Sequence, residues 1–210
     1  MTADVARVVY IVDDDAAVRD SLSMLLRSAG LGVETYPAAA PFLERAASLR
    51  PGCVLLDVRM PGMSGIELQR ELAARRIALP VVIMTGHGEV AVAVQAMKAG
   101  AVDFVEKPFD EEQILGLIEA ALARAAVTYR RAQEVNEATT LVGALSQRER
   151  DVLERLIAGR SNKLIAFDLG ISPRTVEIYR ANMMEKLRAR TVSEAVRIAI
   201  LAGVQMREET

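Results

Sequence analysis

The stretch Cys53-Val54-Leu55-Leu56-Asp57 is a short apolar run that ends on a carboxylate, and it decides how the first half of the chain should fold. Three other apolar runs end beside polar residues in the same way, and a fifth, Gly32-Val33-Glu34-Thr35-Tyr36, carries no such residue. Helical patterns separate the runs, and strands that alternate with helices form a parallel sheet covered by helices. We therefore expect a doubly wound (βα)5 α/β domain with a five-stranded parallel sheet. The three other runs are residues 8–12 before Asp13, Asp14 and Asp15, residues 81–84 before Thr85, and residues 102–106 before Lys107.

Four strand ends should place groups suited to phosphate chemistry together, because the carboxyl ends of parallel strands meet at one edge of a sheet. Asp57 ends the central run and is the expected phosphoacceptor, since a carboxylate can form a covalent acyl phosphate. Mg2+ prefers hard oxygen ligands and keeps several waters, so Asp14 and Asp57 should bind it directly and Asp13 through water. Thr85 can donate a hydrogen bond to a phosphoryl oxygen. Lys107, one of only four lysines, supplies a fixed positive charge.

Simpler interpretations remain open for some residues at these strand ends. An acidic cluster such as Asp13-Asp14-Asp15 is also favoured at a helix N-terminus by the macrodipole, and Asp15 should cap the following helix. Cys53 lies inside an apolar run and should be a buried bystander without a disulfide, because it is the only cysteine. His87, the only histidine, should be a loop residue that influences the access of water to the acyl phosphate.

Length and composition limit the class of protein. The 210 residues allow two small domains with a core each. The chain is 51% hydrophobic and 26% charged, which excludes a disordered or membrane-embedded class. No apolar stretch approaches the length of a membrane span, and the first residues lack a basic region followed by an apolar core. We therefore expect a cytoplasmic protein with no membrane partner.

The charge is distributed unevenly along the chain. Residues 1–124 contain 12 Lys and Arg against 17 Asp and Glu, a net charge of −5. Residues 144–204 contain 11 Lys and Arg against 7 Asp and Glu, a net charge of +4. An acidic first part and a basic second part are expected when one part binds cations and the other binds a polyanion.

From residue 144 onward the pattern changes to helices alone. Ser146 and Glu149 match a capping box at the start of a helix. The three-residue link Gly170-Ile171-Ser172 is typical of a helix-turn-helix, and Pro173 suits the first position of the helix that follows. Ser193 should cap a fourth helix. The pattern predicts an all-α four-helix domain with a helix-turn-helix.

The intervening segment sets the expected domain boundaries. It lacks proline, has no glycine before Gly143, and is rich in Ala, Arg, Glu and Gln, which are good helix formers. We expect a first domain of residues 1–124, a helical linker of residues 125–143 and a second domain of residues 144–210. Within the first domain, Val90, Val94 and Met97 should form the apolar face of a helix before Gly100.

The helix predicted for residues 173–188 has two different faces. Its packing face should contain Val176, Tyr179, Met183 and Leu187, and the opposite face can enter a major groove. There Glu177 could accept a hydrogen bond from a cytosine amino group, while Ile178 and Ala181 could contact thymine methyls. Solvated surface is the alternative for each of them. Phosphate contacts position a protein without reading sequence, and they are expected from Lys163, Thr175, Arg180 and Lys186.

The motifs resemble those of a known family. Asp13-Asp14, Asp57, Thr85 and Lys107-Pro108 resemble the motif set of a response-regulator receiver, which is specific because five separated positions coincide. Residues 144–204 resemble the LuxR-type helix-turn-helix, notably in Leu145-Ser146-Gln147-Arg148-Glu149 and Ser172-Pro173-Arg174-Thr175-Val176-Glu177. With Thr85-Gly86-His87-Gly88 included, the chain is most similar to the FixJ branch of the NarL/FixJ regulators.

This resemblance implies further roles. The main-chain carbonyl of Arg59 would complete the Mg2+ shell. Phe104 would be a switch residue that turns inward when Thr85 moves toward the phosphoryl group, although by itself Phe104 would be interpreted as core. A surface within residues 88–124 would form a homodimer on phosphorylation, and the last helix would pair two DNA-bound copies. Tyr179 stands where many relatives carry His.

Together these features predict a two-component response regulator. A sensor histidine kinase would phosphorylate Asp57 with Mg2+, and the chain would then dimerise, bind double-stranded DNA and regulate transcription, with RNA polymerase as a further candidate partner. A phosphatase would need an acid/base carboxylate near the nucleophile, and Arg59 stands there instead. We therefore expect no enzyme, only a phosphoacceptor with at most slow autodephosphorylation. The remaining alternative is a phospho-dependent protein-interaction module without direct DNA readout.

Overall fold

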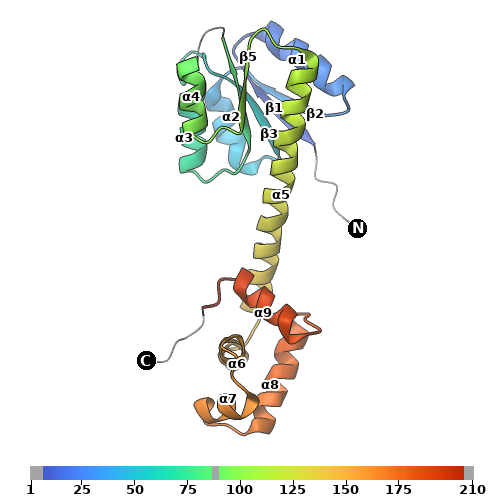
Figure 1. The fold of residues 1–210 in the computed structure, drawn as a ribbon, viewed down its shortest axis with the longest axis vertical. Coiled ribbons are helices and arrows are strands. Elements are labelled where there is room, and N and C mark those ends of the chain that lie inside the picture. The colour runs from blue at the N-terminus through green and yellow to red at the C-terminus, as the bar shows by residue number, and fades with distance from the viewer. Residues whose placement is uncertain (1–6, 87–89, 206–210) are drawn as a thin grey trace. The chain divides into compact units, whose positions relative to one another are not determined.

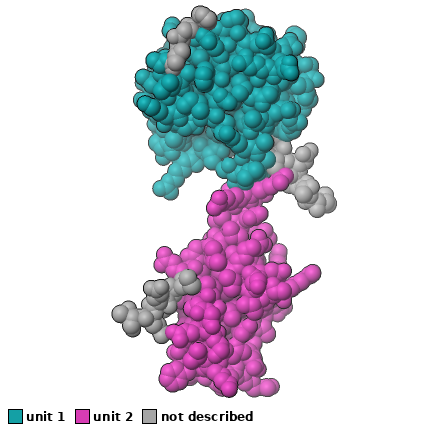
Figure 2. Space-filling view, viewed as in Figure 1, with its two compact units in different colours: residues 1–129 teal, residues 130–210 magenta. Residues whose placement is uncertain are grey.

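The computed structural model describes residues 7–86 and 90–205 (Figure 1). The chain divides into two compact units, Met1–Tyr129 and Arg130–Thr210 (Figure 2). The boundary falls inside one long helix, α5 (Glu111–Gly143), which therefore contributes to both units. Over the described ranges, no helix is both long and apolar enough to cross a membrane.

The first unit contains a five-stranded parallel sheet in the order β2-β1-β3-β4-β5. All six residues of the central strand β3 (Gly52–Asp57) are buried, as its continuous apolar run requires in a parallel sheet covered on both faces. Val12 of β1 is in register with Leu56, and Met84 of β4 is in register with Asp57, so these strands end at the same edge. The sheet confirms the predicted α/β fold. The other strands are β1 (Val8–Val12), β2 (Gly32–Tyr36), β4 (Val81–Thr85) and β5 (Asp103–Glu106).

Helices cover both faces of the sheet (Figure 1). Alternate residues of β1 point to opposite faces. Val9 and Ile11 pack in a core with α1 and α5, whereas Tyr10 and Val12 pack in a core with α2, α3 and α4. The helices are α1 (Ala16–Ser28), α2 (Ala39–Arg45) with a following 3-10 turn (Ala46–Ser48), α3 (Gly65–Ala74) and α4 (Val90–Lys98).

The predicted apolar face of α4 is wrong at Val94 and Met97. Val94 and Met97 are 47% and 42% exposed, and Ala93 and Ala96 are buried in their place. Small side chains allow a helix to approach a sheet closely, so the alanines form the packing side. The larger apolar residues of α4 are left on the surface.

Up to residue 205, where the description of the second unit ends, four helices follow α5 and enclose a core of their own. The predicted capping box is present, because Ser146 N donates to Glu149 Oε2 at 2.7 Å and Glu149 N donates to Ser146 Oγ at 3.4 Å. Gly170 has a φ of +63° between α7 and α8, where a side chain would be strained. The helices are α6 (Gln147–Ile157), α7 (Asn162–Leu169), α8 (Pro173–Lys186) and α9 (Val192–Leu201).

The predicted cap of the last helix is wrong by two residues. Helix α9 begins at Val192, and the Thr191 hydroxyl accepts a hydrogen bond from Glu194 N at 3.2 Å. Ser193 therefore lies inside the first turn. Two hydroxyl residues so close together are both good N-caps, and the local pattern could not choose between them.

Candidate functional site

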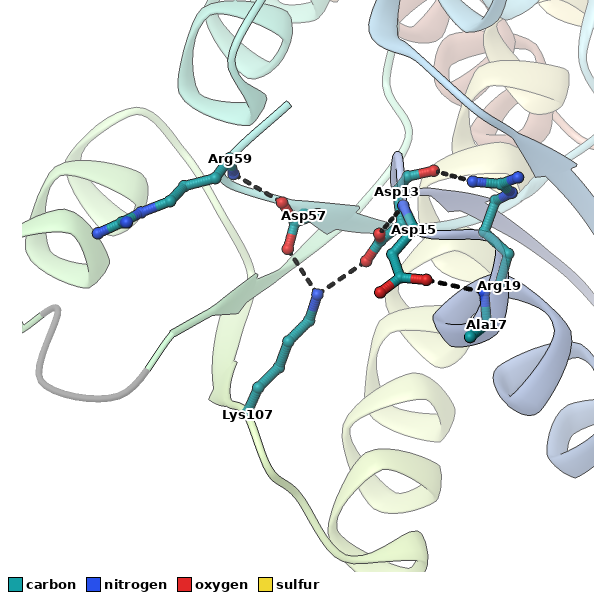
Figure 3. Close-up of polar contacts among 7 residues, drawn as sticks. All are labelled: Asp13, Asp15, Ala17, Arg19, Asp57, Arg59 and Lys107. Atoms are coloured by element: carbon teal, nitrogen blue, oxygen red, sulfur yellow. Dashed lines mark hydrogen bonds and ion pairs between the residues drawn. The ribbon is translucent and has the colours of Figure 1, made fainter. Parts of the chain in front are cut away.

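One ammonium group joins two carboxylates at the carboxyl edge of the sheet (Figure 3). Lys107 Nζ lies 2.8 Å from Asp13 Oδ2 and 2.6 Å from Asp57 Oδ1. Asp13 follows β1, Asp57 ends β3 and Lys107 follows β5, so the sheet brings together residues up to 94 positions apart. The side chains of Asp13, Asp57 and Lys107 are 1%, 11% and 27% exposed. This ionic cluster is therefore largely shielded from water.

Main-chain groups hold the two carboxylates in place. Asp13 Oδ1 accepts a hydrogen bond from Asp15 N at 2.8 Å, and Asp57 Oδ2 accepts one from Arg59 N at 2.7 Å. Figure 3 shows the Arg59 side chain extending away from the Asp57 carboxylate. Arg19 Nη1 donates to the main-chain oxygen of Asp13 at 2.7 Å. The orientation of both acids is thus set from the backbone.

Burial and charge change the protonation of this cluster. Burial raises the pKa of Asp57; Lys107 opposes the rise, the Asp13 carboxylate adds to it, and the net pKa is above its usual value. Burial lowers the pKa of Lys107, but the hydrogen bonds and charges of Asp13 and Asp57 outweigh it, so the net pKa is raised. One cation thus faces two anions, and the surplus of negative charge favours a further cation.

The other predicted residues of this site lie at different depths. Thr85 is buried at the end of β4, and its main-chain oxygen accepts a hydrogen bond from Lys107 N at 2.8 Å. Asp14 is exposed between β1 and α1. Phe104 is 41% exposed on β5, so its interpretation as a core residue is wrong. His87 lies outside the described residues.

Asp15 and Cys53 behave as the simpler interpretations predicted. The Asp15 side chain accepts a hydrogen bond from Ala17 N at 2.8 Å and caps α1. Cys53 is buried and free on β3. Burial raises the pKa of its thiol to about 12, so it is not a nucleophile near neutral pH.

The donor atoms of the site suit Mg2+. Within the described part of the chain, no three or more His, Cys, Asp or Glu side chains are grouped so as to hold a metal ion. Mg2+ does not require such a cage, because it usually binds through one or two carboxylates and keeps several waters. Asp13 and Asp57 provide two hard carboxylates next to each other, so the residues present fit this ion.

Sequence reasoning assigned no role to two residues that shape the site. Gly65 opens α3, and a Cβ at this position would overlap the main-chain oxygen of Asp57. The signal was a glycine directly after Ser64, which caps α3 with Glu67 in a capping box. Arg19 supports Asp13 from one turn inside α1, and nothing in its spacing distinguished it from a surface arginine.

The second unit presents a different surface. Val176, Met183 and Leu187 of the α8 segment are fully buried, which confirms the predicted packing face. Glu177, Ile178 and Ala181 are exposed on the other side of α8. Over the described residues, none of these three belongs to the hydrophobic core of the unit.

The predicted phosphate-binding residues differ in their surroundings. Lys163 is exposed on α7. The Thr175 hydroxyl lies 2.8 Å from Ser172 Oγ, and Arg180 Nη1 donates to Asn162 Oδ1 at 2.5 Å. Lys186 Nζ lies 2.6 Å from Glu149 Oε2, whose side chain is only 4% exposed. Thr175, Arg180 and Lys186 thus already have partners inside the unit, and their DNA contacts stay predictions.

The two halves match two different families. Residues 9–119 match the family described as response regulator receiver domain. Residues 143–199 match the family described as bacterial regulatory proteins, luxR family.

Similar proteins extend over nearly the whole chain. The transcriptional regulatory protein FixJ of Azorhizobium caulinodans is 53% identical over 196 residues, which are 93% of each chain. The FixJ protein of Bradyrhizobium diazoefficiens is 50% identical over 93% of this chain and 96% of its own. Among solved structures, the response regulator StyR has 43% identity and a TM-score of 0.83, over 93% of this chain and 98% of that one. Full-length FixJ from B. japonicum has 50% identity and a TM-score of 0.57, over 95% and 98%.

Proposed function

Because this chain belongs to the two-component response regulators that join a receiver domain to a LuxR-type DNA-binding domain, as the FixJ regulators do, we propose that Asp57 is its phosphoacceptor. Membership in this family makes the chain a transcription regulator with a sensor kinase as partner and DNA as target. One observation supports Asp57 above all: its carboxylate shares the Lys107 ammonium with Asp13 at the ligand-binding edge of the sheet.

The chemistry follows from this arrangement. An Asp57 oxygen attacks the phosphorus of a phosphohistidine on the kinase, an oxygen–phosphorus bond forms, and the nitrogen–phosphorus bond of the histidine breaks. Arg59 N and Lys107 hold the carboxylate in position before the attack. Mg2+, held by Asp13, Asp14, Asp57 and the main-chain oxygen of Arg59, would neutralise charge on the incoming group. Because Arg59 stands two residues after Asp57, where a phosphatase would need an acid/base carboxylate, the chain acts as a phosphoacceptor with at most slow autodephosphorylation.

The new phosphoryl group would bias an existing conformational equilibrium. Its oxygens would accept a hydrogen bond from the Thr85 hydroxyl, and Phe104 would turn inward behind it. The face formed by α4, β5 and α5 within residues 88–124 would then pair two copies of the chain. Val94 and Met97 already expose apolar surface on this face.

The paired chain would bind DNA through the second unit in the cytoplasm, with RNA polymerase as a further partner. Glu177, Ile178 and Ala181 are exposed on α8, and they would contact base edges. Lys163, Thr175, Arg180 and Lys186 would contact phosphates. Ile200, 63% exposed on α9, would help to pair two DNA-bound copies.

The test compares wild type with Asp57→Asn and with Asp20→Asn, a control that removes an exposed carboxylate from α1. Each protein is incubated with acetyl phosphate and Mg2+, and intact mass is measured. Wild type and Asp20→Asn should gain one phosphoryl group, and Asp57→Asn none. Equal labelling of Asp57→Asn would refute the assignment.

DNA binding is measured on the same samples, with a site selected from a random pool by the phosphorylated protein. Phosphorylation should tighten binding, and affinity should fall by about a thousandfold or more between 50 and 200 mM salt if six or more phosphates are contacted. A protein-interaction module would show no such salt dependence. A DNA affinity that is the same with and without phosphorylation would contradict the proposed switch.

A further inference from the structure

Arg19 lies beside the carboxylate cluster, and the proposed function gives it no role. Its Nη1 donates a hydrogen bond to the main-chain oxygen of Asp13 at 2.7 Å (Figure 3). The neighbouring residues Asp14, Asp15 and Asp20 offer carboxylates, yet among the described residues the guanidinium makes no ion pair with any of them. A cation that is surrounded in sequence by anions, and still donates to a neutral carbonyl, has its place set by geometry more than by charge.

The oxygen that accepts this hydrogen bond belongs to the peptide group between Asp13 and Asp14. A peptide group is planar, so a hydrogen bond that fixes its oxygen also fixes the direction in which the chain enters Asp14. The Asp14 side chain is exposed, and it makes no hydrogen bond or ion pair with another described residue. The position of its carboxylate therefore depends on the main chain that Arg19 holds.

Asp13, in contrast, is held by groups other than Arg19. Its main-chain nitrogen donates to Tyr36 O at 3.2 Å, and its Oδ1 accepts from Asp15 N at 2.8 Å. Its Oδ2 lies 2.8 Å from Lys107 Nζ. None of these three contacts uses the main-chain oxygen of Asp13. Loss of Arg19 should therefore leave Asp13 in place and release only the peptide group that follows it.

We propose that Arg19 is a positioning residue for Mg2+, because its hydrogen bond to the Asp13 main-chain oxygen restricts Asp14 to positions from which the carboxylate can bind the ion. The inference rests on the proposed function, in which Asp14 helps to hold Mg2+. Removal of a group that orients a metal ligand typically lowers metal affinity by about 10–100-fold. Arg19 acts on Mg2+ through Asp14 and not through its own charge.

The sign of the effect separates positioning from electrostatics. A guanidinium near a cation site repels the cation, so removal of its charge alone should strengthen Mg2+ binding, whereas loss of positioning should weaken it. Arg27, at the other end of α1, is a matched control, because its Nη2 also donates to a main-chain oxygen, that of Val33 at 3.4 Å. Arg27→Met removes the same charge and a similar contact from the same helix, far along it from Asp13.

The test measures the affinity of the full-length chain for Mg2+ alone, with no phosphate donor present. The ion is titrated, and the amide NMR shifts of Asp14 and Asp57 are followed. The proteins are wild type, Arg19→Met, Arg19→Lys, Arg27→Met, Asp14→Asn and the double variant Arg19→Met/Asp14→Asn. Urea unfolding in Mg2+-free buffer shows that each variant is folded, and Arg19→Gln replaces Arg19→Met if the latter is not.

Arg19→Met should bind Mg2+ about tenfold more weakly than wild type, and Arg27→Met should bind it as tightly as wild type or more tightly. Arg19→Lys keeps the charge and can still donate a hydrogen bond, so its affinity should lie between those of wild type and Arg19→Met. In the Asp14→Asn background, Arg19→Met should change the affinity by less than about twofold, because no carboxylate is left to position.

Phosphorylation by acetyl phosphate gives a second measurement. Arg19→Met should need about tenfold more Mg2+ for its half-maximal rate, since the metal site is weakened. Its rate at saturating Mg2+ should stay within about twofold of wild type, because a substitution that only weakens binding leaves the maximal rate unchanged.

Three results would overturn the proposal. One is Mg2+ binding by Arg19→Met that equals or exceeds that of wild type, which would leave Arg19 only an electrostatic role. Another is an equal loss of affinity with and without the Asp14 carboxylate, and the third is the same loss in Arg27→Met. Failure of wild type to bind Mg2+ at all contradicts the proposed function itself, and the wild-type titration detects this before any variant is compared.

Discussion

Replacement of Lys107 by methionine removes the ammonium group that Asp13 and Asp57 share, and it keeps a side chain of similar length. Two carboxylates with exposures of 1% and 11% then face each other without that cation. Removing one partner from a buried ion pair costs about 3–5 kcal/mol. Because Lys107 itself is 27% exposed and water can replace part of its charge, we expect Lys107→Met to lower the stability of the first unit by about 2–3 kcal/mol at pH 7.

The loss should depend on pH in a defined direction. Burial already raises the pKa of Asp57 above its usual value of 3.8, and removal of the ammonium raises it further. The folded variant then binds a proton at a pH where the unfolded chain is still ionised. Stability of the variant therefore falls as pH rises from 3.8 through the raised pKa. The loss of stability in Lys107→Met relative to wild type should therefore become smaller at pH values below this range.

Hydrogen exchange of the amides in β1 and β3 measures the stability of this unit by itself, which matters because two units need not unfold together. A double-mutant cycle with Asp13→Asn isolates the repulsion between the Asp13 and Asp57 carboxylates. In that background Lys107→Met should cost roughly 1 kcal/mol less, because one of the two carboxylates is already neutral. A cost below about 0.5 kcal/mol at pH 7, or one that Asp13→Asn does not change, would refute this reasoning.

Three further predictions concern other parts of the chain. Gly65→Ala should destabilise the first unit by about 1–3 kcal/mol and slow phosphorylation of Asp57, because the added Cβ overlaps the main-chain oxygen of Asp57. The control Gly116→Ala has nothing within 4 Å of the added atom, so it should instead stabilise the first unit by up to about 1 kcal/mol in urea titrations. Glu149→Gln should weaken the second unit by about 1–2 kcal/mol, seen as faster exchange in α6 and α8, because the ion pair with Lys186 is lost. Burial raises the pKa of Tyr10 from 10.0 to about 12, so the unfolded chain loses this proton first and wild-type stability falls as pH rises from 10.0 to about 12. Tyr10→Phe should flatten that fall in urea titrations followed by circular dichroism, and an unchanged slope would count against it.

Sequence reasoning succeeded where the pattern is local. The apolar run of β3, the capping box at Ser146 and the glycine between α7 and α8 each occupy a few adjacent residues, and all three are present. It failed on α4, where apolar periodicity pointed to Val94 and Met97 but Ala93 and Ala96 are the buried residues. Apolar periodicity within a helix does not by itself specify which of its residues will pack against a sheet.

The sequence by itself determined the order of strands and helices and the edge of the sheet where Asp13, Asp57, Thr85 and Lys107 gather, because alternation of strands and helices forces parallel strands to end together. Only the tertiary structure decided which groups touch. The Lys107 bridge and the pairing of Lys186 with Glu149 join elements far apart in the chain, and the lack of room for a side chain at Gly65 beside Asp57 arises between two successive elements. Such contacts depend on distances of a few ångströms between packed elements, and packing fixes those distances.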